Sequence, residues 1–251
     1  MTRLKYILLG TVLPFFLLLD CFGQKPSQTT LEKSVEAVDH DTWDILLKRH
    51  VDGEGNVDYK GFIADSGQLK GYLEYLSGNP IADSAPKEER LAYYINLYNA
   101  GTVQLILDNY PLGSIKDIFR PWGKERLKIG DDSFSLGEIE HDILREMGEP
   151  RIHFAINCAS YSCPKLLNRA YSASKLEEQL EKATFDFIND PTKNKISQDR
   201  IALSKIFKWY RSDFTTENPL IDYLGKYVDI KIPQDTEIDF LTYDWDLNEK
   251  R

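Results

Sequence analysis

The chain is poor in sulfur and in histidine. Its 251 residues include only three cysteines, two methionines and four histidines. A disulfide-dense scaffold is excluded, because such proteins carry several cysteine pairs in a short chain. The compact paired Cys and His spacings of zinc modules are also absent. Any thiol chemistry must therefore use Cys21, Cys158 or Cys163.

The chain also lacks an N-terminal hydrophobic run that is long enough to cross a membrane. The apolar residues 7–19 number 13, whereas a transmembrane helix needs about 20. Arg3 and Lys5 precede this run, and the small residue Gly23 follows it. This order is typical of a secretory signal peptide. We predict a signal peptide over residues 1–23, whose removal leaves Gln24 as the first residue.

A lipid anchor at Cys21, as in bacterial lipoproteins, is the alternative. That processing prefers a small neutral residue before the cysteine, and Asp20 is neither. The sequence therefore predicts an exported protein, periplasmic or extracellular, with the anchor at Cys21 disfavoured.

Positive charge is in deficit, with 31 Lys and Arg against 40 Asp and Glu and a net charge of −9. Removal of residues 1–23 moves the net charge to −10. A protein of this charge repels nucleic acid and anionic lipid surfaces, so neither is a predicted partner. Export would also place Cys158 and Cys163 where a disulfide persists.

Repeats, low-complexity tracts and interdomain linkers are absent from the sequence. With 42% hydrophobic and 28% charged residues, the composition is that of a globular protein. We predict a polar lead-in and N-terminal helix over residues 24–51 and one globular domain over residues 52–248. Strands and helices mix without a regular βαβ rhythm. This pattern favours a helix-rich α+β domain with a small, mostly antiparallel sheet.

The clearest predicted helix lies between Pro86 and Asn109. It is apolar around much of its circumference, so we expect a central, buried helix. Asn96 and Asn99 would then be buried, and a buried amide needs hydrogen-bond partners. Bonds to nearby backbone are the favoured interpretation for both.

The remaining elements follow from hydrophobic spacing, capping residues and turns. Helices are predicted over residues 31–49, 60–76, 135–147, 174–189, 206–214 and 219–227, with a short one after Pro164 and capping boxes at Ser135–Glu138 and Ser174–Glu177. Hairpins are predicted over residues 126–134 and 195–203, and short strands over residues 57–59, 151–157, 228–232 and 238–243.

The strand predicted over residues 151–157 carries the candidate site, because it ends at Cys158 and contains His153. If the strand is regular, alternation places His153 and Cys158 on opposite faces. A bulge or turn would then be needed to bring them together. His141, on the preceding helix, is at least as good a partner for Cys158. Glu140 adjoins His141 in sequence but projects about 100° away around a helix, so it is not automatically the group that orients it.

Four interpretations of this segment stay open. Cys158 and Cys163 form a disulfide, or a thiol hydrolase or acyltransferase uses a Cys158 thiolate activated by His141 or His153. In the enzyme, Asn96 or Asn157 would orient the histidine or stabilise an oxyanion, and Cys163 is the alternative nucleophile. The third is a metal site from the two histidines and two cysteines, and in the fourth both cysteines are buried apolar residues. The candidate catalytic residues are Cys158, His153, His141, Asn96 and Glu140.

Aromatic residues gather near the end of the chain and define a second class of function. Core packing explains most of them. In the alternative interpretation, some of them form the wall of a groove that binds a small molecule, glycan or peptide. The aromatic residues concerned are Trp209, Tyr210, Phe214, Tyr243 and Trp245. No cofactor and no resident metal is predicted.

Several segments of the chain are similar to one known family. The similarity lies in residues 92–100, 135–145 with their Ile-Glu-His core, 151–164, 203–214 and 243–248. These segments resemble, in the expected order, those of domain of unknown function family 547, over most of residues 52–248. The resemblance implies membership, without an activity or catalytic residues to carry over. Thiol proteases and transglutaminases usually place the cysteine at the start of a central helix, where this chain has Asn96, and that departure disfavours an enzyme.

Overall fold

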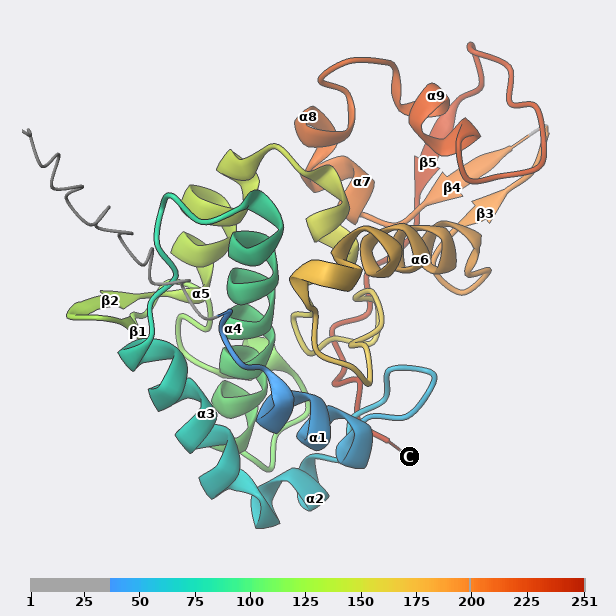
Figure 1. Ribbon diagram of the computed structural model, residues 1–251. Helices are drawn as coiled ribbons and strands as arrows, with labels where there is room; N and C mark the ends of the chain where they lie inside the picture. Colours follow the sequence, from blue (N-terminus) through green and yellow to red (C-terminus); the bar gives the residue numbers. More distant parts are fainter. Residues whose placement is uncertain (1–36, 199, 251) are drawn as a thin grey trace, which may run out of the picture. The chain divides into compact units, whose positions relative to one another are not determined.

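Helix α4 (Lys87–Leu107) runs through the middle of the fold, and other helices pack around it (Figure 1). Most of its residues are buried, because their apolar side chains occur on nearly all sides of the helix. Pro86 stands at the N-cap, where its missing N–H costs nothing. The prediction of a central buried helix is confirmed.

The computed structural model describes residues 37–198 and 200–250. The predicted signal peptide over residues 1–23, the polar lead-in and the start of the helix predicted over residues 31–49 therefore lie outside the described residues. Among the helices of the described residues, none has the length and apolarity that crossing a membrane requires.

The first half of the described chain contributes the elements around α4. They are α1 (Asp41–His50), α2 (Tyr59–Ala64), α3 (Ser66–Gly78), η1 (Ile115–Asp117), β1 (Leu127–Ile129), β2 (Asp132–Phe134), α5 (Leu136–Glu138), the π-helical η2 (Ile139–Leu144) and η3 (Arg145–Met147). The last three form one continuous helical run. Ser135 caps it through the predicted capping box with Glu138.

The second half begins with two 3₁₀ segments and continues through short helices and strands. They are η4 (Pro150–Phe154), η5 (Ala173–Lys175), α6 (Leu176–Asn189), β3 (Lys195–Ile196), β4 (Ile201–Leu203), α7 (Ile206–Trp209), α8 (Arg211–Phe214), α9 (Leu220–Gly225) and β5 (Ile238–Phe240). Both predicted hairpins are present as β1–β2 and β3–β4, each antiparallel. Strand β5 adds to β4 in parallel. The helix-rich α+β class is confirmed.

Two hydrophobic clusters form the interior. The first surrounds α1 to α4, and the second is built from α6, α7, α8, α9 and β4. Segment η4 lies between them: Ile152 and Ile156 pack in the first cluster, and Phe154 packs in the second. The chain around η4 is therefore held from both sides.

The prediction of a strand over residues 151–157 is wrong. Pro150 occupies the first turn of a 3₁₀ helix, and the Glu149 side chain accepts a hydrogen bond from the Arg151 backbone N–H. The alternating apolar residues indicated a strand, but they serve two different hydrophobic clusters. A segment buried on all sides has no period that distinguishes strand from helix.

Other local predictions also differ from the structure. No helix follows Pro164, and residues 228–232 form no strand. Ser174 lies inside the 3₁₀ turn η5, so it is not the cap of α6. Val57 makes only isolated bridges to Val51 and Glu249. These are short segments, where packing decides the conformation.

Candidate functional site

A cavity of about 380 Å³ opens where the two hydrophobic clusters meet. One part of its lining is aromatic: Tyr98, Trp122, Trp209, Tyr210, Tyr243 and Trp245. The polar and sulfur-bearing part consists of Glu140, His141, His153, Cys158 and Cys163, and Ile156, Pro164 and Ile206 complete the lining. Four of the five predicted catalytic residues therefore meet at one cavity.

The two cysteines form a disulfide in the cavity wall, with 6.3 Å between their Cα atoms. Cys158 is partly exposed, whereas Cys163 is buried. The disulfide occupies both sulfur atoms. A resting cysteine nucleophile is therefore absent from the structure as described.

The loop between the cysteines is fixed by the C-terminal segment. The Tyr161 N–H donates to the Asp246 carbonyl at 2.7 Å, and the Asn248 N–H donates to the Ala159 carbonyl at 3.2 Å. Ala159 has a φ of +60°, a left-handed conformation that costs a residue with a Cβ some free energy. The backbone pairing holds it in place.

Helix α4 positions the start of the same loop through Asn99. Its amide nitrogen donates to the Ala155 carbonyl at 3.0 Å, and its amide oxygen accepts from the Asn157 N–H at 2.8 Å. Asn157 in turn accepts from the Ala159 N–H at 2.8 Å and donates to the Pro164 carbonyl at 2.7 Å. Two buried asparagines therefore set the path of the backbone into and out of the disulfide loop.

His153 is buried, and the Tyr210 ring stacks on it at 3.9 Å between centroids. Its Nε2 lies 2.8 Å from Oδ2 of Asp213. Burial lowers the pKa of His153, so the ring is neutral near neutral pH. Because a carboxylate only accepts, Nε2 carries the proton and Nδ1 has the lone pair. Nδ1 makes no hydrogen bond to any part of the chain that the structure describes.

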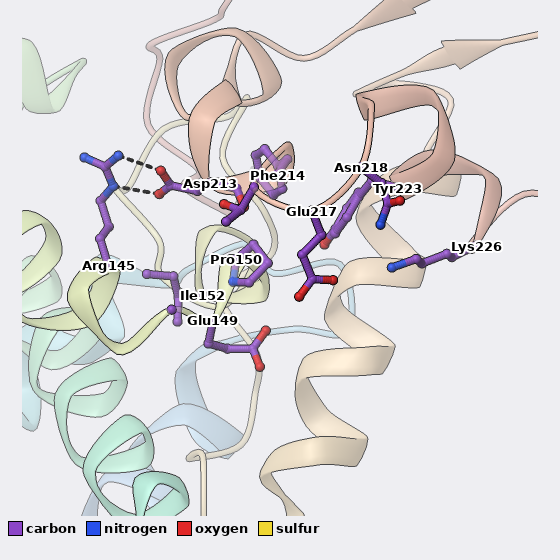
Figure 2. Close-up of a pocket in the computed structure, with 12 residues that line it drawn as sticks. Arg145, Glu149, Pro150, Ile152, Asp213, Phe214, Glu217, Asn218, Tyr223 and Lys226 are labelled. Atoms are coloured by element: carbon purple, nitrogen blue, oxygen red, sulfur yellow. Dashed lines mark hydrogen bonds and ion pairs between the residues drawn. The ribbon is translucent and has the colours of Figure 1, made fainter. Parts of the chain in front are cut away.

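Asp213 is held by Arg145 in a two-pronged ion pair, with both nitrogen–oxygen distances at 2.7 Å (Figure 2). This guanidinium keeps the pKa of Asp213 well below its ordinary value. A second cavity, of about 300 Å³, lies beside the pair, and Figure 2 shows Glu149, Glu217 and Lys226 among its lining residues. Asp213 therefore lines this second cavity while it bonds His153 of the first.

Glu140 is a buried carboxylate held by two tyrosines. Tyr98 donates to its Oε2 at 3.1 Å, and Tyr210 donates to its Oε1. Burial, and then the carboxylate itself, raise the pKa of both tyrosines, so their hydroxyls stay protonated. His141 is exposed, and its Nδ1 lies 3.4 Å from Nη1 of Arg145. As expected from helix geometry, Glu140 does not orient His141.

Four aromatic rings form a continuous wall on one side of the cavity. Ring centroids lie 4.5 Å apart for Tyr243 and Trp245, 4.8 Å for Trp209 and Tyr243, and 5.7 Å for Trp122 and Trp245. Trp209 is 46% exposed, so part of the wall faces solvent. Phe214, also considered for a groove, is instead buried in the second cluster.

Asn96 is the predicted site residue that the structure keeps apart from the cavity. Its amide nitrogen donates to the Tyr171 carbonyl at 2.8 Å, and its oxygen accepts from the Tyr171 N–H at 3.0 Å. Bonding to backbone, the favoured interpretation, is therefore confirmed for Asn96 and for Asn99. Opposite faces for His153 and Cys158 were conditional on a regular strand, and that condition is not met. Residues 150–154 form a 3₁₀ turn, and both side chains line one cavity.

Arg145 and Asp213 are site residues that the sequence analysis did not predict. The two residues are 68 positions apart, and although both fall in segments that resemble the family, neither was singled out as a site residue. Glu140 was indicated as a neighbour of His141, but its contact with Tyr98 needs the folded chain. The concentration of aromatic residues near the C-terminus did indicate a ligand groove, and Trp209, Tyr210, Tyr243 and Trp245 line the cavity.

No curated protein and no solved structure matches the chain. A family model described as "Protein of unknown function, DUF547" matches residues 82–188. This segment runs from the start of α4 to the end of α6 and includes Cys158, Cys163 and His153. The cavity residues Trp209 and Trp245 lie after it. This match over residues 82–188 supports the resemblance of the chain to the DUF547 family of proteins of unknown function.

Proposed function

We propose that this is an exported, non-catalytic binding module that takes one glycan ring into the cavity. One observation carries the proposal: both cysteine sulfurs are joined, while the cavity around them has an aromatic wall and polar acceptors. Aromatic faces stack on the apolar faces of sugar rings. Glu140 lines the cavity and has acceptor positions beyond its two tyrosine bonds, so a sugar hydroxyl finds a partner there.

Replacement of Trp209 with alanine is expected to weaken glycan binding about tenfold, because it removes a stacking face worth roughly 1.4 kcal/mol. The measurement is tryptophan emission during titration with cellotetraose and with chitotetraose. Three of the chain's four tryptophans line the cavity, so emission reports on its occupancy. Trp122 and Trp245 remain as reporters in the variant.

Phe185→Ala provides the matched control, since Phe185 is 53% exposed on α6 and lies outside the cavity lining. It should bind as the unaltered chain does. A panel of tripeptides forms the second arm of the titration. Saturation by the tripeptides alone, or equal binding by the Trp209 variant, would overturn the glycan assignment.

Export rests on the signal-like residues 1–23 and agrees with a disulfide in the described fold. Expression of the full chain in a bacterial host should yield a periplasmic product whose mass is that of a chain beginning at Gln24. A product that retains Met1 in the cytoplasm would contradict export. A product beginning at a lipid-modified Cys21 would select the anchored alternative.

A thiol hydrolase is the second candidate, and the His153–Asp213 pair favours it. Asp213 fixes the Nε2 proton and leaves Nδ1 as a base in the same cavity as Cys158. This activity requires prior reduction of the disulfide. The test is hydrolysis of p-nitrophenyl acetate by the reduced protein, compared with Cys158→Ser and His153→Gln. Equal rates in all three would exclude it.

A further inference from the structure

The two sulfur atoms of the Cys158–Cys163 disulfide have different surroundings. Sγ of Cys163 accepts hydrogen bonds from the Cys158 backbone N–H at 3.0 Å and from the Tyr243 hydroxyl at 3.2 Å. The Ser160 hydroxyl donates to Tyr243 at 3.0 Å, which strengthens Tyr243 as a donor. Sγ of Cys158 has only the longer contacts, 3.3 Å to Ser160 and 3.5 Å to Tyr243.

Hydrogen-bond donors stabilise a thiolate much more than they stabilise a sulfur without charge. The Cys158 N–H and the Tyr243 hydroxyl are already in place around Cys163. Negative charge that develops on the Cys163 sulfur during cleavage would therefore meet two oriented donors. In thiol–disulfide exchange a stabilised thiolate is the better leaving group. The arrangement makes Cys163 the leaving sulfur.

Access points to the other sulfur as the one attacked. Cys158 is partly exposed and lines the open cavity, whereas Cys163 is only 5% exposed. We propose that this disulfide is a site of thiol–disulfide exchange, at which a small external thiol attacks Cys158 and releases Cys163. The proposal is independent of the ligand assigned to the cavity.

The reaction has two steps. A thiolate of the external thiol attacks Sγ of Cys158, a new sulfur–sulfur bond forms, and the bond to Cys163 breaks with its electron pair on Cys163. A second external thiolate then attacks the mixed disulfide and releases Cys158. Two external thiols become one disulfide, the protein disulfide becomes two thiols, and the two protons of the external thiols end on the cysteines.

The fold allows this exchange without unfolding. Backbone hydrogen bonds from Tyr161 to Asp246, from Ser162 to Asp244 and from Asn248 to Ala159 hold the loop independently of the disulfide. Asn157 bonds both Ala159 and Pro164. The loop therefore keeps its place when the sulfur–sulfur bond is broken.

The test uses the full chain with Cys21→Ser in every arm, so that only the cavity sulfurs react. Reduced glutathione is added under native conditions, and the products are trapped by acid and analysed by mass spectrometry. We expect a glutathione adduct on Cys158, located by fragmentation of the peptide that contains both cysteines. Tyr243→Phe should slow reduction about tenfold, because it removes one hydrogen bond to the developing thiolate. Ser160→Ala should slow it less.

Tyr93→Phe is the matched control, since Tyr93 is buried and its hydroxyl donates at 2.8 Å to the Leu76 carbonyl. It should react at the rate of the parent chain. Circular dichroism establishes that each variant is folded, and an unfolded Tyr243 variant leaves Ser160→Ala to carry the comparison. An adduct on Cys163, equal rates in all variants, or reduction only in denaturant would each overturn the proposal.

Discussion

Replacement of Asn99 with leucine is expected to lower the free energy of unfolding by about 4 kcal/mol. Leucine is close to asparagine in size, so the main loss is the two hydrogen bonds to the chain around Ala155 and Asn157. Each bond satisfies a buried backbone group, and an unsatisfied buried group costs roughly 1–3 kcal/mol. Urea unfolding followed by circular dichroism measures the change.

The same helix supplies two comparisons for this prediction. Asn96→Leu removes the same kind of bridge to Tyr171 and should cost a similar amount, but it leaves the cavity unchanged. Thr102→Val removes a buried hydroxyl that makes no hydrogen bond to the described residues, so it should be neutral or stabilising. A cost below 1 kcal/mol for Asn99→Leu would contradict the bridging role.

Asn99 also illustrates how far sequence reasoning reaches. The periodicity of residues 87–107 predicts a buried helix, and burial of an amide predicts hydrogen-bonded partners. The identity of the partners does not follow, because Ala155 and Asn157 are more than fifty positions away. Tertiary packing selects them, and a single sequence carries no record of that choice.

For the segment that ends at Cys158, the sequence predicted the location of the candidate site but not its conformation. The scarcity of cysteine and histidine placed the candidate site at this segment, and the two cysteines, His153 and His141 do meet at one cavity. Its conformation did not follow. Pro150 begins the 3₁₀ turn that brings His153 to the face of Cys158, and the alternating apolar residues do not indicate that turn.

Arg145 and Asp213 were missed for a different reason. Charged residues are common on protein surfaces, and sequence alone does not indicate which of them are partly buried. In the fold, Asp213 is 19% exposed and bonds both Arg145 and His153. The pair therefore joins α8 to η3 and η4 across the boundary between the two hydrophobic clusters.

Asp213→Asn is expected to destabilise the protein by roughly 2–3 kcal/mol at pH 7. The change keeps the shape of the side chain and removes the charge that Arg145 requires, and charge-assisted hydrogen bonds are worth about that much. An amide nitrogen would also face donors on Arg145 or His153. Asp186→Asn is the matched control, because its ion pair with Lys182 lies on the surface and should change stability by less than about 0.5 kcal/mol.

The pH dependence of unfolding separates the contributions of Asp213 and His153. The pKa of Asp213 is lower in the folded protein than in the unfolded chain. Asp213 therefore contributes its full stabilisation above its ordinary pKa near 4, and this stabilisation is lost as the pH falls below that value. The folded pKa of His153 is also lowered, so the unfolded chain binds a proton first as the pH falls below about 6.5. Acidification therefore lowers the free energy of unfolding of the unaltered protein in two stages, one below about pH 6.5 and one below about pH 4.

In Asp213→Asn only the stage below pH 4 should shrink, and the stage that begins near pH 6.5 should persist. Urea midpoints measured from pH 7 to pH 3 test this, with the difference between the two proteins narrowing below pH 4. A constant difference across the whole range would mean that the charge of Asp213 does not stabilise the fold. If the variant loses no stability between pH 6.5 and pH 4, the stage that begins near pH 6.5 belongs to Asp213 and not to His153.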